Sequence, residues 1–430
     1  MKQQSKTSRR PTGIDLFAGA GGLSLGFEQA GFDIAAAVEI DPIHCATHEY
    51  NFPHCKVLCS SVVDLTGDTI RERAGLGTDD IDVVFGGAPC QGFSLIGKRA
   101  LDDDRNQLVF HYVRLVSELK PKYCVFENVK GLTLGKHAQF LDELIEALGR
   151  AGYDVLLPYK VLNAADFGVP QSRQRLFLIG ARRGQALPRY PQPETVRTTV
   201  WDAIGDLPDA DDYPELLDSD SVRLDWPTDS TYAQRLRGLK SDPTDYSYRR
   251  HFDVNALSAS MRTEHTELSK SRFTATSHGD TEPVSRFKKL DPEGLCNTLR
   301  AGTDSARGAF TSPRPIHPFR PRVITVREAA RLHSYPDWFR FHSTKWHGFR
   351  QIGNSVPPLL GRAVGREIID ALGGKPSKPR QVVHLGAEDL LHVQMAAATS
   401  YFGVARHVIA QRSRKVASNP ETNQDNAEIL

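Results

Sequence analysis

The first half of the chain alternates short apolar segments with helical patterns, and this alternation limits the fold more than any other feature. The apolar segments have the length of strands and cover residues 12–17, 34–40, 81–85 and 123–127, and the helical patterns cover residues 23–30, 106–119 and 137–151. Strands that alternate with helices in this way are typical of parallel sheets with crossover helices. We therefore predict an α/β fold with a doubly wound, mostly parallel sheet. Residues 155–161 and 175–179 are expected to pair as a hairpin at the edge of that sheet.

Beyond residue 183 the alternation fades, and it returns only near residue 320. The intervening segment is rich in proline, aspartate and other polar residues, which predicts a second domain of irregular, partly β structure. Near residue 320, Thr325 and Glu328 have the spacing of a capping box, so we expect a helix from Thr325 to Leu332. We also expect a helix to begin at Ile352. The predicted divisions are a disordered arm (1–11), the α/β domain (12–183), the second domain (184–319), the completion of the α/β domain (320–372), a helical extension (373–412) and a disordered tail (413–430).

Composition and charge limit the class of protein. The 430 residues are 40% hydrophobic and 25% charged, which is ordinary for globular proteins. A formal net charge of only +2 excludes a basic protein that wraps nucleic acid over its whole surface, so any DNA surface has to be local. No apolar run suits a signal peptide or a membrane span, and six cysteines lack disulfide-like spacing. These features predict a cytoplasmic protein without membrane contact.

Histidines and cysteines gather near residue 50 and raise the question of a metal site. His44 and His48 have the i, i+4 spacing of the HExxH zinc motif, but Cys45 stands where that motif has glutamate. Cys55 and Cys59 follow without the spacing of a zinc site. Ordinary packing explains this group better, and we predict no metal.

A glycine-rich turn, Gly19-Ala20-Gly21-Gly22, follows the first predicted strand. Such a turn allows a ligand to approach the backbone closely, at the strand ends where open α/β sheets bind cofactors. Glu39 follows Gly19 by 20 residues and ends the second predicted strand, where a carboxylate can hold the ribose hydroxyls of an adenosine. Both a nicotinamide nucleotide and S-adenosylmethionine would use this acid, so the turn alone leaves the cofactor open.

Further polar signatures follow the other strands. In chain order they are Asp15-Leu16-Phe17-Ala18-Gly19-Ala20-Gly21-Gly22, Pro89-Cys90-Gln91, Phe126-Glu127-Asn128-Val129, Gln171-Ser172-Arg173-Gln174-Arg175 and Gly353-Asn354-Ser355-Val356. This ordered set resembles the DNA (cytosine-5)-methyltransferase family of the bacterial type II restriction-modification kind. The resemblance extends from about residue 12 to 370. It implies a class I S-adenosylmethionine-dependent fold.

The resemblance also assigns the catalytic roles. Cys90 would add to C6 of a cytosine, because this turns the electron-poor C5 into a carbon nucleophile. Glu127 would pair with N3 and the exocyclic amine, Arg175 would bind O2, and Arg173 would bind either Glu127 or the backbone. The cytosine has to be flipped out of duplex DNA to reach these groups, and the loop from Gln91 to Arg105 is expected to close over the DNA.

For the cofactor, the resemblance favours S-adenosylmethionine. It places Phe17 and the turn from Gly19 to Gly22 around the methionine part and Glu39 on the ribose. The adenine-contacting aspartate of the family is absent, and Ser61 or the backbone of Val62 replaces it. The rest of the predicted lining consists of Ala20, Leu23, Ile40, Pro89, Leu108, Asn354 and Ser355.

The second domain corresponds to the family's target-recognition domain. It carries basic and aromatic residues that suit phosphate and base contacts, namely Arg235, Arg237, Lys240, Arg249, Arg250, Arg262, Lys270, Arg272, Arg286, Lys288 and Lys289, with Tyr246, Tyr248, Phe252, Phe273 and Phe287. The expected partner is duplex DNA, and a separately acting restriction endonuclease is a candidate partner. We expect a nucleoid-associated monomer.

The predicted function is methylation of cytosine C5 in a short duplex sequence, as protection in a restriction-modification system. A tRNA-directed relative would have a shorter recognition region, and a catalytically inactive DNA-binding relative would not need Cys90, Glu127 and Arg175 together. A nicotinamide dehydrogenase would leave Cys90 and Glu127 unexplained.

Overall fold

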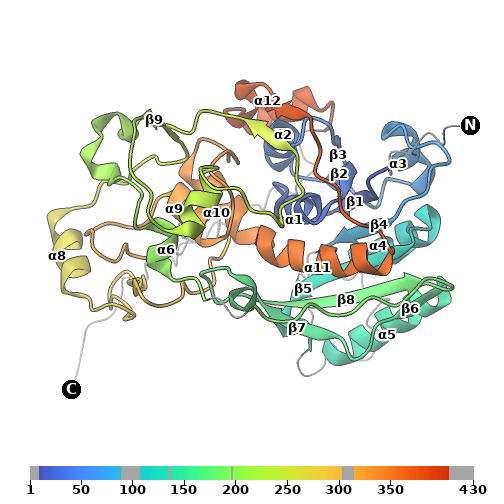
Figure 1. Cartoon of the computed structure of the whole chain (residues 1–430). Coiled ribbons are helices and arrows are strands. Elements are labelled where there is room, and N and C mark those ends of the chain that lie inside the picture. Colours follow the sequence, from blue (N-terminus) through green and yellow to red (C-terminus); the bar gives the residue numbers. More distant parts are fainter. Residues whose placement is uncertain (1–8, 89–106, 134–136, 195–196, 303–313, 406–430) are drawn as a thin grey trace, which may run out of the picture.

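The computed structural model describes residues 9–88, 107–133, 137–194, 197–302 and 314–405. Its central feature is a mixed sheet with the order β3-β2-β1-β4-β5-β8-β6, in which β7 also pairs with β8 (Figure 1). The strands are β1 (Thr12–Leu16), β2 (Asp33–Glu39), β3 (Lys56–Cys59), β4 (Val83–Gly86), β5 (Tyr123–Val129), β6 (Tyr153–Val155), β7 (Lys160–Asn163) and β8 (Gln174–Arg182). The first five are parallel, and β8 runs antiparallel to β5, β6 and β7. The predicted α/β fold with a mostly parallel sheet is confirmed.

Helices cover both faces of this sheet. They are α1 (Gly22–Ala30), α2 (Pro42–Asn51), α3 (Gly67–Arg73), α4 (Gln107–Leu119), α5 (His137–Arg150) and α11 (Pro358–Ala371). Successive side chains of a strand point to opposite faces, so Phe85 packs in one core with Phe27 of α1, whereas Val84 packs in the other with Leu115 of α4. Two buried faces explain why the central strands are almost wholly apolar.

The predicted edge hairpin is only partly correct. Residues 155–161 do not form one strand, because the segment is divided into β6 and β7, which both pair with β8. Pro158 lies in the break, and a proline has no N–H to donate to a sheet. Moreover, β8 is not an edge strand, because it lies between β5 on one side and β6 and β7 on the other.

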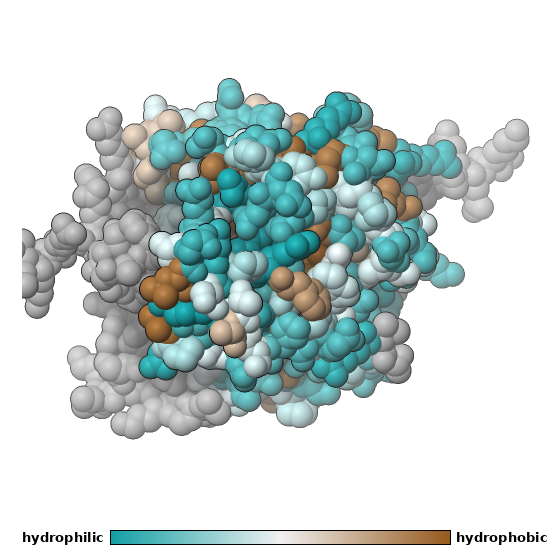
Figure 2. Space-filling model, turned by 90° about the vertical axis from the view of Figure 1, so that its left-hand side faces the viewer, coloured by the Kyte–Doolittle hydropathy of each residue, from teal (hydrophilic) through white to brown (hydrophobic). Residues whose placement is uncertain are grey.

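Between β8 and α9 the described chain contains only short elements. They are α6 (Val200–Ile204), β9 (Val222–Arg223), α7 (Thr231–Leu236), β10 (Arg249–His251), β11 (Ala256–Leu257) and α8 (Glu267–Ala275), with the 3-10 helices η5 (Ala210–Asp212) and η6 (Pro214–Leu217). Most of this irregular, partly β segment lies at the opposite end of the molecule from β6 and α5 (Figure 1), whereas residues 246–250 lie against α1. The face seen at that end is mostly hydrophilic, with small scattered apolar groups (Figure 2).

The chain then returns to the sheet. Helix α9 (Val326–Leu332) begins with the predicted capping box, in which Thr325 accepts from the N–H of Glu328 and Glu328 accepts from the N–H of Thr325. Helix α10 (Lys345–Asn354) ends in the segment where a helix was expected to begin, and the next helix, α11, begins only at Pro358. Helix α11 packs closely on α1, because a Cβ on Gly26 would lie 2.6 Å from the carbonyl oxygen of Pro358. Both ends of the chain therefore build one sheet domain.

The segment after α11 differs from its prediction. A helical extension was expected over residues 373–412, but the helices in its described part are only the 3-10 helix η8 (Glu388–Leu391) and the short helix α12 (Met395–Tyr401). Leu390 and Leu391 pack against Ala46 and Tyr50 of α2, so the extension docks on the sheet domain. Strand β12 (Val382–His384), which was not predicted, pairs in parallel with β10.

Two further 3-10 helices, η3 (Lys130–Thr133) and η4 (Ala164–Phe167), directly follow β5 and β7. Among the described helices, none has the length and apolar character required to cross a membrane. The predicted arm and tail fall mainly on residues 1–8 and 406–430, which lie outside the described residues.

Candidate functional site

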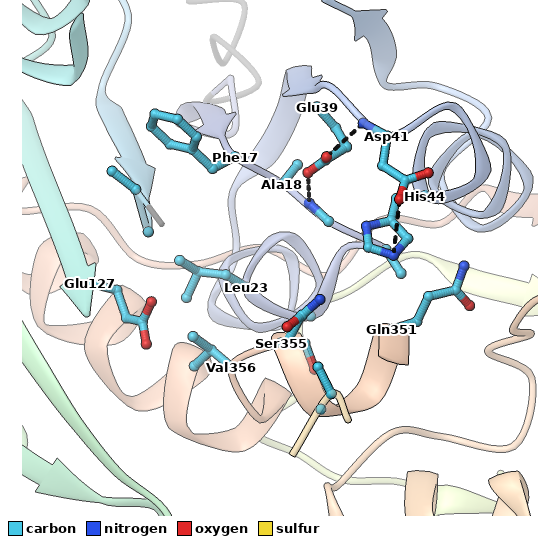
Figure 3. A pocket seen from close by; sticks show the side chains of 18 of the residues that line it. Phe17, Ala18, Leu23, Glu39, Asp41, His44, Glu127, Gln351, Ser355 and Val356 are labelled. Carbon is cyan, nitrogen blue, oxygen red and sulfur yellow. Dashed lines mark hydrogen bonds and ion pairs between the residues drawn. The ribbon is translucent and has the colours of Figure 1, made fainter. Parts of the chain in front are cut away.

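A cavity of about 700 Å³ opens at the carboxyl ends of β1, β2, β4 and β5. This is the edge at which the strand order reverses between β1 and β4, the usual ligand position in open α/β sheets. Predicted residues that line it are Phe17, Gly19, Ala20, Gly22, Leu23, Glu39, Ile40, Ser61, Val62, Leu108, Glu127, Arg173, Arg175, Asn354 and Ser355. Gly21 does not line it, and Pro89, Cys90 and the Gln91–Arg105 loop lie outside the described residues. Figure 3 shows Phe17, Leu23, Glu39 and Glu127 around the cavity.

The rim at the ends of β1 and β2 is built around the Glu39 carboxylate. One carboxylate oxygen accepts from the N–H of Gly19 at 2.8 Å, and the other accepts from Ile40 at 2.9 Å and Asp41 at 2.8 Å. Phe17 has a φ of +66°, a backbone conformation that non-glycine residues rarely adopt outside functional sites. Three backbone donors thus hold Glu39 in a fixed position on the cavity wall.

A second part of the wall comes from the loop after β3 and from α4. Ser61, Val62 and Leu108 line it, whereas Asp64 does not. The Ser61 hydroxyl accepts from the N–H of Val63, and the Val62 carbonyl accepts from Arg114 at 2.8 Å. This part of the cavity wall therefore consists of serine and apolar residues, and Asp64 contributes no carboxylate to it.

The buried end of the cavity holds an ion pair between two strands. Arg175 Nε lies 2.9 Å from Glu127 Oε1, and both side chains are 12% exposed. Burial raises the pKa of Glu127 above its ordinary value, although Arg175 and Arg173 act in the opposite direction. The site therefore contains a carboxyl group that holds a proton more readily than a solvated glutamate does.

The end of β4 lies directly against this carboxyl group. A Cβ on Gly87 would come within 2.3 Å of Glu127 Oε2, so a larger residue at this position would displace the Glu127 carboxyl group. The side-chain amide of Asn128 donates to the carbonyl of Ala88 at 3.0 Å. Glu127 and Asn128 consequently fix the backbone two residues before Cys90.

Arg173 has a different environment from Arg175. It is fully buried and donates to the carbonyl oxygens of Leu299 at 2.6 Å, Gly353 at 2.7 Å and Ser355 at 2.8 Å. Of the two partners predicted for it, Glu127 or the backbone, its hydrogen bonds go to the backbone. Arg173 thus holds three distant segments of the chain around the cavity.

Sequence reasoning missed several lining residues. Asp15 accepts from the Ser24 hydroxyl at 2.6 Å, and burial raises its pKa to about 8 against the effect of that hydrogen bond. Asp41, His44 and Arg350 also line the cavity. Arg350 could have been found, because it stands four residues before Asn354 and hence on the same side of a helix. Asp41 and His44 lacked such a signal.

Comparison with known proteins decides the family. The profile of C-5 cytosine-specific DNA methylases matches residues 12–370. The chain belongs to this family. It is 66% identical over 421 residues to the type II methyltransferase M.XorII of Xanthomonas oryzae, which covers 98% of this chain and 99% of the relative. The type II methyltransferase M.AgeI of Thalassovita gelatinovora is 33% identical, over 83% of this chain and 98% of the relative.

Solved structures agree with this assignment. A prophage-encoded E. coli protein superposes with a TM-score of 0.70 at 35% identity, over 84% of this chain and 99% of that protein. The S. pombe Dnmt2 methyltransferase has a TM-score of 0.52 at 17% identity, which supports the shared fold alone. The protein is thus a type II DNA (cytosine-5-)-methyltransferase, and the dehydrogenase alternative is excluded.

The residues of the cavity fit the S-adenosylmethionine that this methyltransferase family implies. A cavity of about 700 Å³ has the size of a small-ligand site. Glu39 is held at its rim as an acceptor for hydroxyl groups, and Phe17, Val62 and Leu108 supply apolar walls. No group of three or more His, Cys, Asp or Glu residues in the described part of the methyltransferase could hold a metal ion.

Two basic residues predicted to face DNA have other roles in this methyltransferase. The Arg250 side chain is 2% exposed and forms a two-fold ion pair with Glu28 at 2.7 and 2.8 Å. Arg237 is buried over the ring of Trp226 at 3.5 Å and donates to the carbonyl of Val254. The prediction of DNA contacts is wrong for these two, because burial leaves no surface for a phosphate.

Proposed function

We propose that the protein transfers a methyl group from S-adenosylmethionine to C5 of a flipped-out cytosine in a specific short duplex DNA sequence. The observation that carries this proposal is a single cavity that joins the Glu39 rim to the buried Glu127–Arg175 pair. Such a cavity can hold an adenosine and a pyrimidine base side by side. Protection of host DNA beside a separately acting restriction endonuclease would be its biological use.

For the cofactor, Glu39 would accept from the ribose hydroxyls, Phe17 and the turn from Gly19 to Gly22 would lie around the methionine part, and Val62 and Leu108 would lie beside the adenine. Asn354 and Ser355, which end α10 on the opposite wall, would complete the site. When bound, S-adenosylmethionine supplies an electrophilic methyl group on a sulfonium. The remaining chemistry falls to side chains of this protein.

Cys90 would act as the nucleophile. Consecutive Cα atoms are about 3.8 Å apart, so covalent geometry keeps Cys90 within about 7.6 Å of Ala88. Ala88 itself is tied to Asn128, the neighbour of Glu127. Addition of the Cys90 thiolate forms an S–C6 bond and makes C5 nucleophilic. After methylation, a water molecule takes the C5 proton and the S–C6 bond breaks, which restores the aromatic ring and the thiolate.

Glu127 and Arg175 would bind the base during these steps. A neutral Glu127 can donate to N3 and accept from the exocyclic amine, and its raised pKa favours that form. Arg175 would bind O2, so that charge developing on the ring is stabilised at both positions. A base stacked inside a duplex cannot reach a cavity of this kind, which is why flipping is part of the proposal.

The test uses plasmid DNA of mixed sequence, labelled S-adenosylmethionine and the full chain. Label transfer followed by bisulfite sequencing is expected to reveal protected cytosines at one short repeated sequence. Cys90→Ser should abolish transfer, whereas Cys55→Ser, a buried cysteine that does not line the cavity, should retain it.

A duplex with 5-fluorocytosine at the methylated position tests the covalent step. The product of methyl transfer then has no C5 proton to lose, so the Cys90 adduct should persist through denaturing electrophoresis. Transfer to tRNA instead of DNA would contradict the proposed substrate. Transfer to DNA that survives Cys90→Ser would contradict the proposed nucleophile.

A further inference from the structure

One arginine at the cavity has no role in the proposed steps. Four arginines of the described chain line the cavity, namely Arg173, Arg175, Arg300 and Arg350. Arg173 is buried among backbone carbonyls and Arg175 pairs with Glu127, whereas Arg300 is exposed. A residue that lines a cavity and is also exposed to solvent lies at its mouth. Arg300 therefore carries a positive charge at an opening of the cavity.

This opening belongs to the end of the cavity where the proposed steps place the base. Arg173 donates to the carbonyl of Leu299 at 2.6 Å, so the residue just before Arg300 lies against the segment that leads to Arg175. Val129 is the register partner of Arg175 across β5 and β8, and it lines the cavity while remaining 48% exposed. The pocket proposed for the cytosine therefore opens to solvent beside Arg300.

The backbone that carries Arg300 is fixed on both sides. The carbonyl of Leu299 is held by Arg173, and its N–H donates to the Gln171 side chain at 3.2 Å. A Cβ on Gly353 would lie 2.5 Å from the carbonyl oxygen of Arg300, so α10 packs directly against this segment. A side chain on a fixed backbone loses less conformational freedom when it binds a ligand, because only its own rotamers have to be ordered.

The guanidinium of Arg300 has no hydrogen-bond or ion-pair partner among the residues that the structure describes. Its position suits an anion that arrives with the substrate. A nucleotide that flips rotates about its own backbone, so its base enters the pocket while its phosphates stay at the mouth. A guanidinium can donate two N–H groups to the oxygens of one phosphate.

We propose that Arg300 binds one of the two phosphates that flank the flipped cytosine, an inference that rests on the proposed function. The contact holds the sugar–phosphate backbone at the mouth of the cavity while Glu127 and Arg175 hold the base. Phosphate contacts position a protein on DNA without reading its sequence. Arg300 therefore positions the target nucleotide whatever the surrounding recognition sequence is.

Duplexes with a single methylphosphonate linkage test the contact, because this linkage has the shape of a phosphodiester without its charge. The neutral linkage is placed at each position in turn around the cytosine identified by bisulfite sequencing. Affinity is measured by titration of each labelled duplex with the full chain and S-adenosylhomocysteine. The unmodified protein should lose about tenfold or more in affinity at one of the two linkages that adjoin the target cytosine. Arg300→Met should show a similar loss on the natural duplex and no further loss from that linkage.

Salt dependence and control variants complete the test. Loss of one phosphate contact should reduce the slope of log affinity against log salt concentration by about 1 in Arg300→Met. Arg300→Lys keeps the charge and should recover part of the affinity. Arg73→Met, which changes an exposed arginine of α3 outside the cavity, should bind every duplex as the unmodified protein does. Because Arg300 is exposed, Arg300→Met should leave urea unfolding and the affinity for S-adenosylhomocysteine without DNA unchanged.

The outcomes distinguish this inference from the proposed function. A neutral linkage beside the target cytosine that weakens Arg300→Met as much as the unmodified protein would overturn the phosphate contact. Unchanged DNA affinity in Arg300→Met would overturn it as well, and weaker binding of S-adenosylhomocysteine would assign Arg300 to the cofactor instead. Each of these results leaves DNA methylation by the unmodified protein in place. Absence of methyl transfer from the unmodified protein to DNA would overturn the proposed function and this inference with it.

Discussion

Asp15 links the stability of this methyltransferase to pH at the level of one side chain. Its carboxyl group is 1% exposed, and burial raises its pKa to about 8 although Ser24 donates to it. An unfolded aspartate has a pKa of about 3.9, so the folded protein holds this proton more tightly. The stability that Asp15 contributes is therefore full below the unfolded pKa and is lost as pH rises through the folded pKa.

Asp15→Asn should remove this dependence while keeping an acceptor for the Ser24 hydroxyl. As the pH rises from about 5 to about 8, the unmodified protein should lose on the order of 3 kcal/mol of unfolding free energy that the variant retains. Urea denaturation at both pH values measures the difference. Asp142→Asn, at an exposed position of α5, should give a curve parallel to that of the unmodified protein. Parallel curves for Asp15→Asn as well would show that Asp15 is already ionised in the folded protein.

At the scale of elements, η8 holds the C-terminal extension against α2. Leu391 is fully buried beside Ala46 and Tyr50, and its carbonyl accepts from the N–H of Ser343 at 2.9 Å. Truncation of a buried leucine leaves a cavity, so Leu391→Ala should lower the free energy of unfolding by about 2–5 kcal/mol. Leu268→Ala, on the 68% exposed leucine of α8, should change it by less than about 0.5 kcal/mol. Equal stability of the two variants in urea would mean that the extension is not docked in solution.

The elements that the sequence predicts well are those with strong local periodicity. Strands β1, β2, β4 and β5 and helices α1, α4 and α5 could be predicted, because both faces of each strand and one face of each helix are buried. Strand β3 and helices α2 and α3 were not predicted. The division of residues 155–161 into β6 and β7 and the short helices after residue 387 depend on distant partners. Leu390 and Leu391 contact α2, which lies more than 300 residues earlier in the chain. Local propensity contains no information on such contacts.

At the scale of the whole molecule, the site is assembled from both ends of the chain, and only its residue types could be predicted. The ordered motifs identify Glu39, Glu127 and Arg175 because chemistry requires those types at strand ends. Their partners could not be predicted: Arg173 holds backbone carbonyls, and the Asp41–His44–Arg350 cluster joins helices that are about 300 residues apart. For the same reason, exposed and buried arginines of the recognition segment look alike in the sequence.

Arg250 shows how the recognition segment is joined to the sheet domain, and it supplies a test at this scale. Its guanidinium pairs with Glu28 of α1 at 2.7 and 2.8 Å and lies 4.7 Å from the ring of Trp338, with both charged side chains less than 10% exposed. Removal of one partner leaves an uncompensated buried charge, so Arg250→Met should lower the free energy of unfolding by about 3–5 kcal/mol. Arg249→Met, at the exposed neighbouring position of β10, should have little effect on unfolding.

The double variant Glu28→Gln/Arg250→Met separates this pairing from a contact with DNA. It should recover part of the lost stability, because the unpaired carboxylate is removed along with the guanidinium. A guanidinium that bound a phosphate would behave differently, since its loss would weaken DNA binding and reduce the salt dependence of that binding without changing the unfolding free energy. Urea denaturation and DNA titration of the unmodified protein, Arg250→Met and the double variant thus decide whether Arg250 holds the two parts of the molecule together or faces the substrate. Because Arg250 and Glu28 are both buried, we predict that Arg250 holds the two parts of the molecule together.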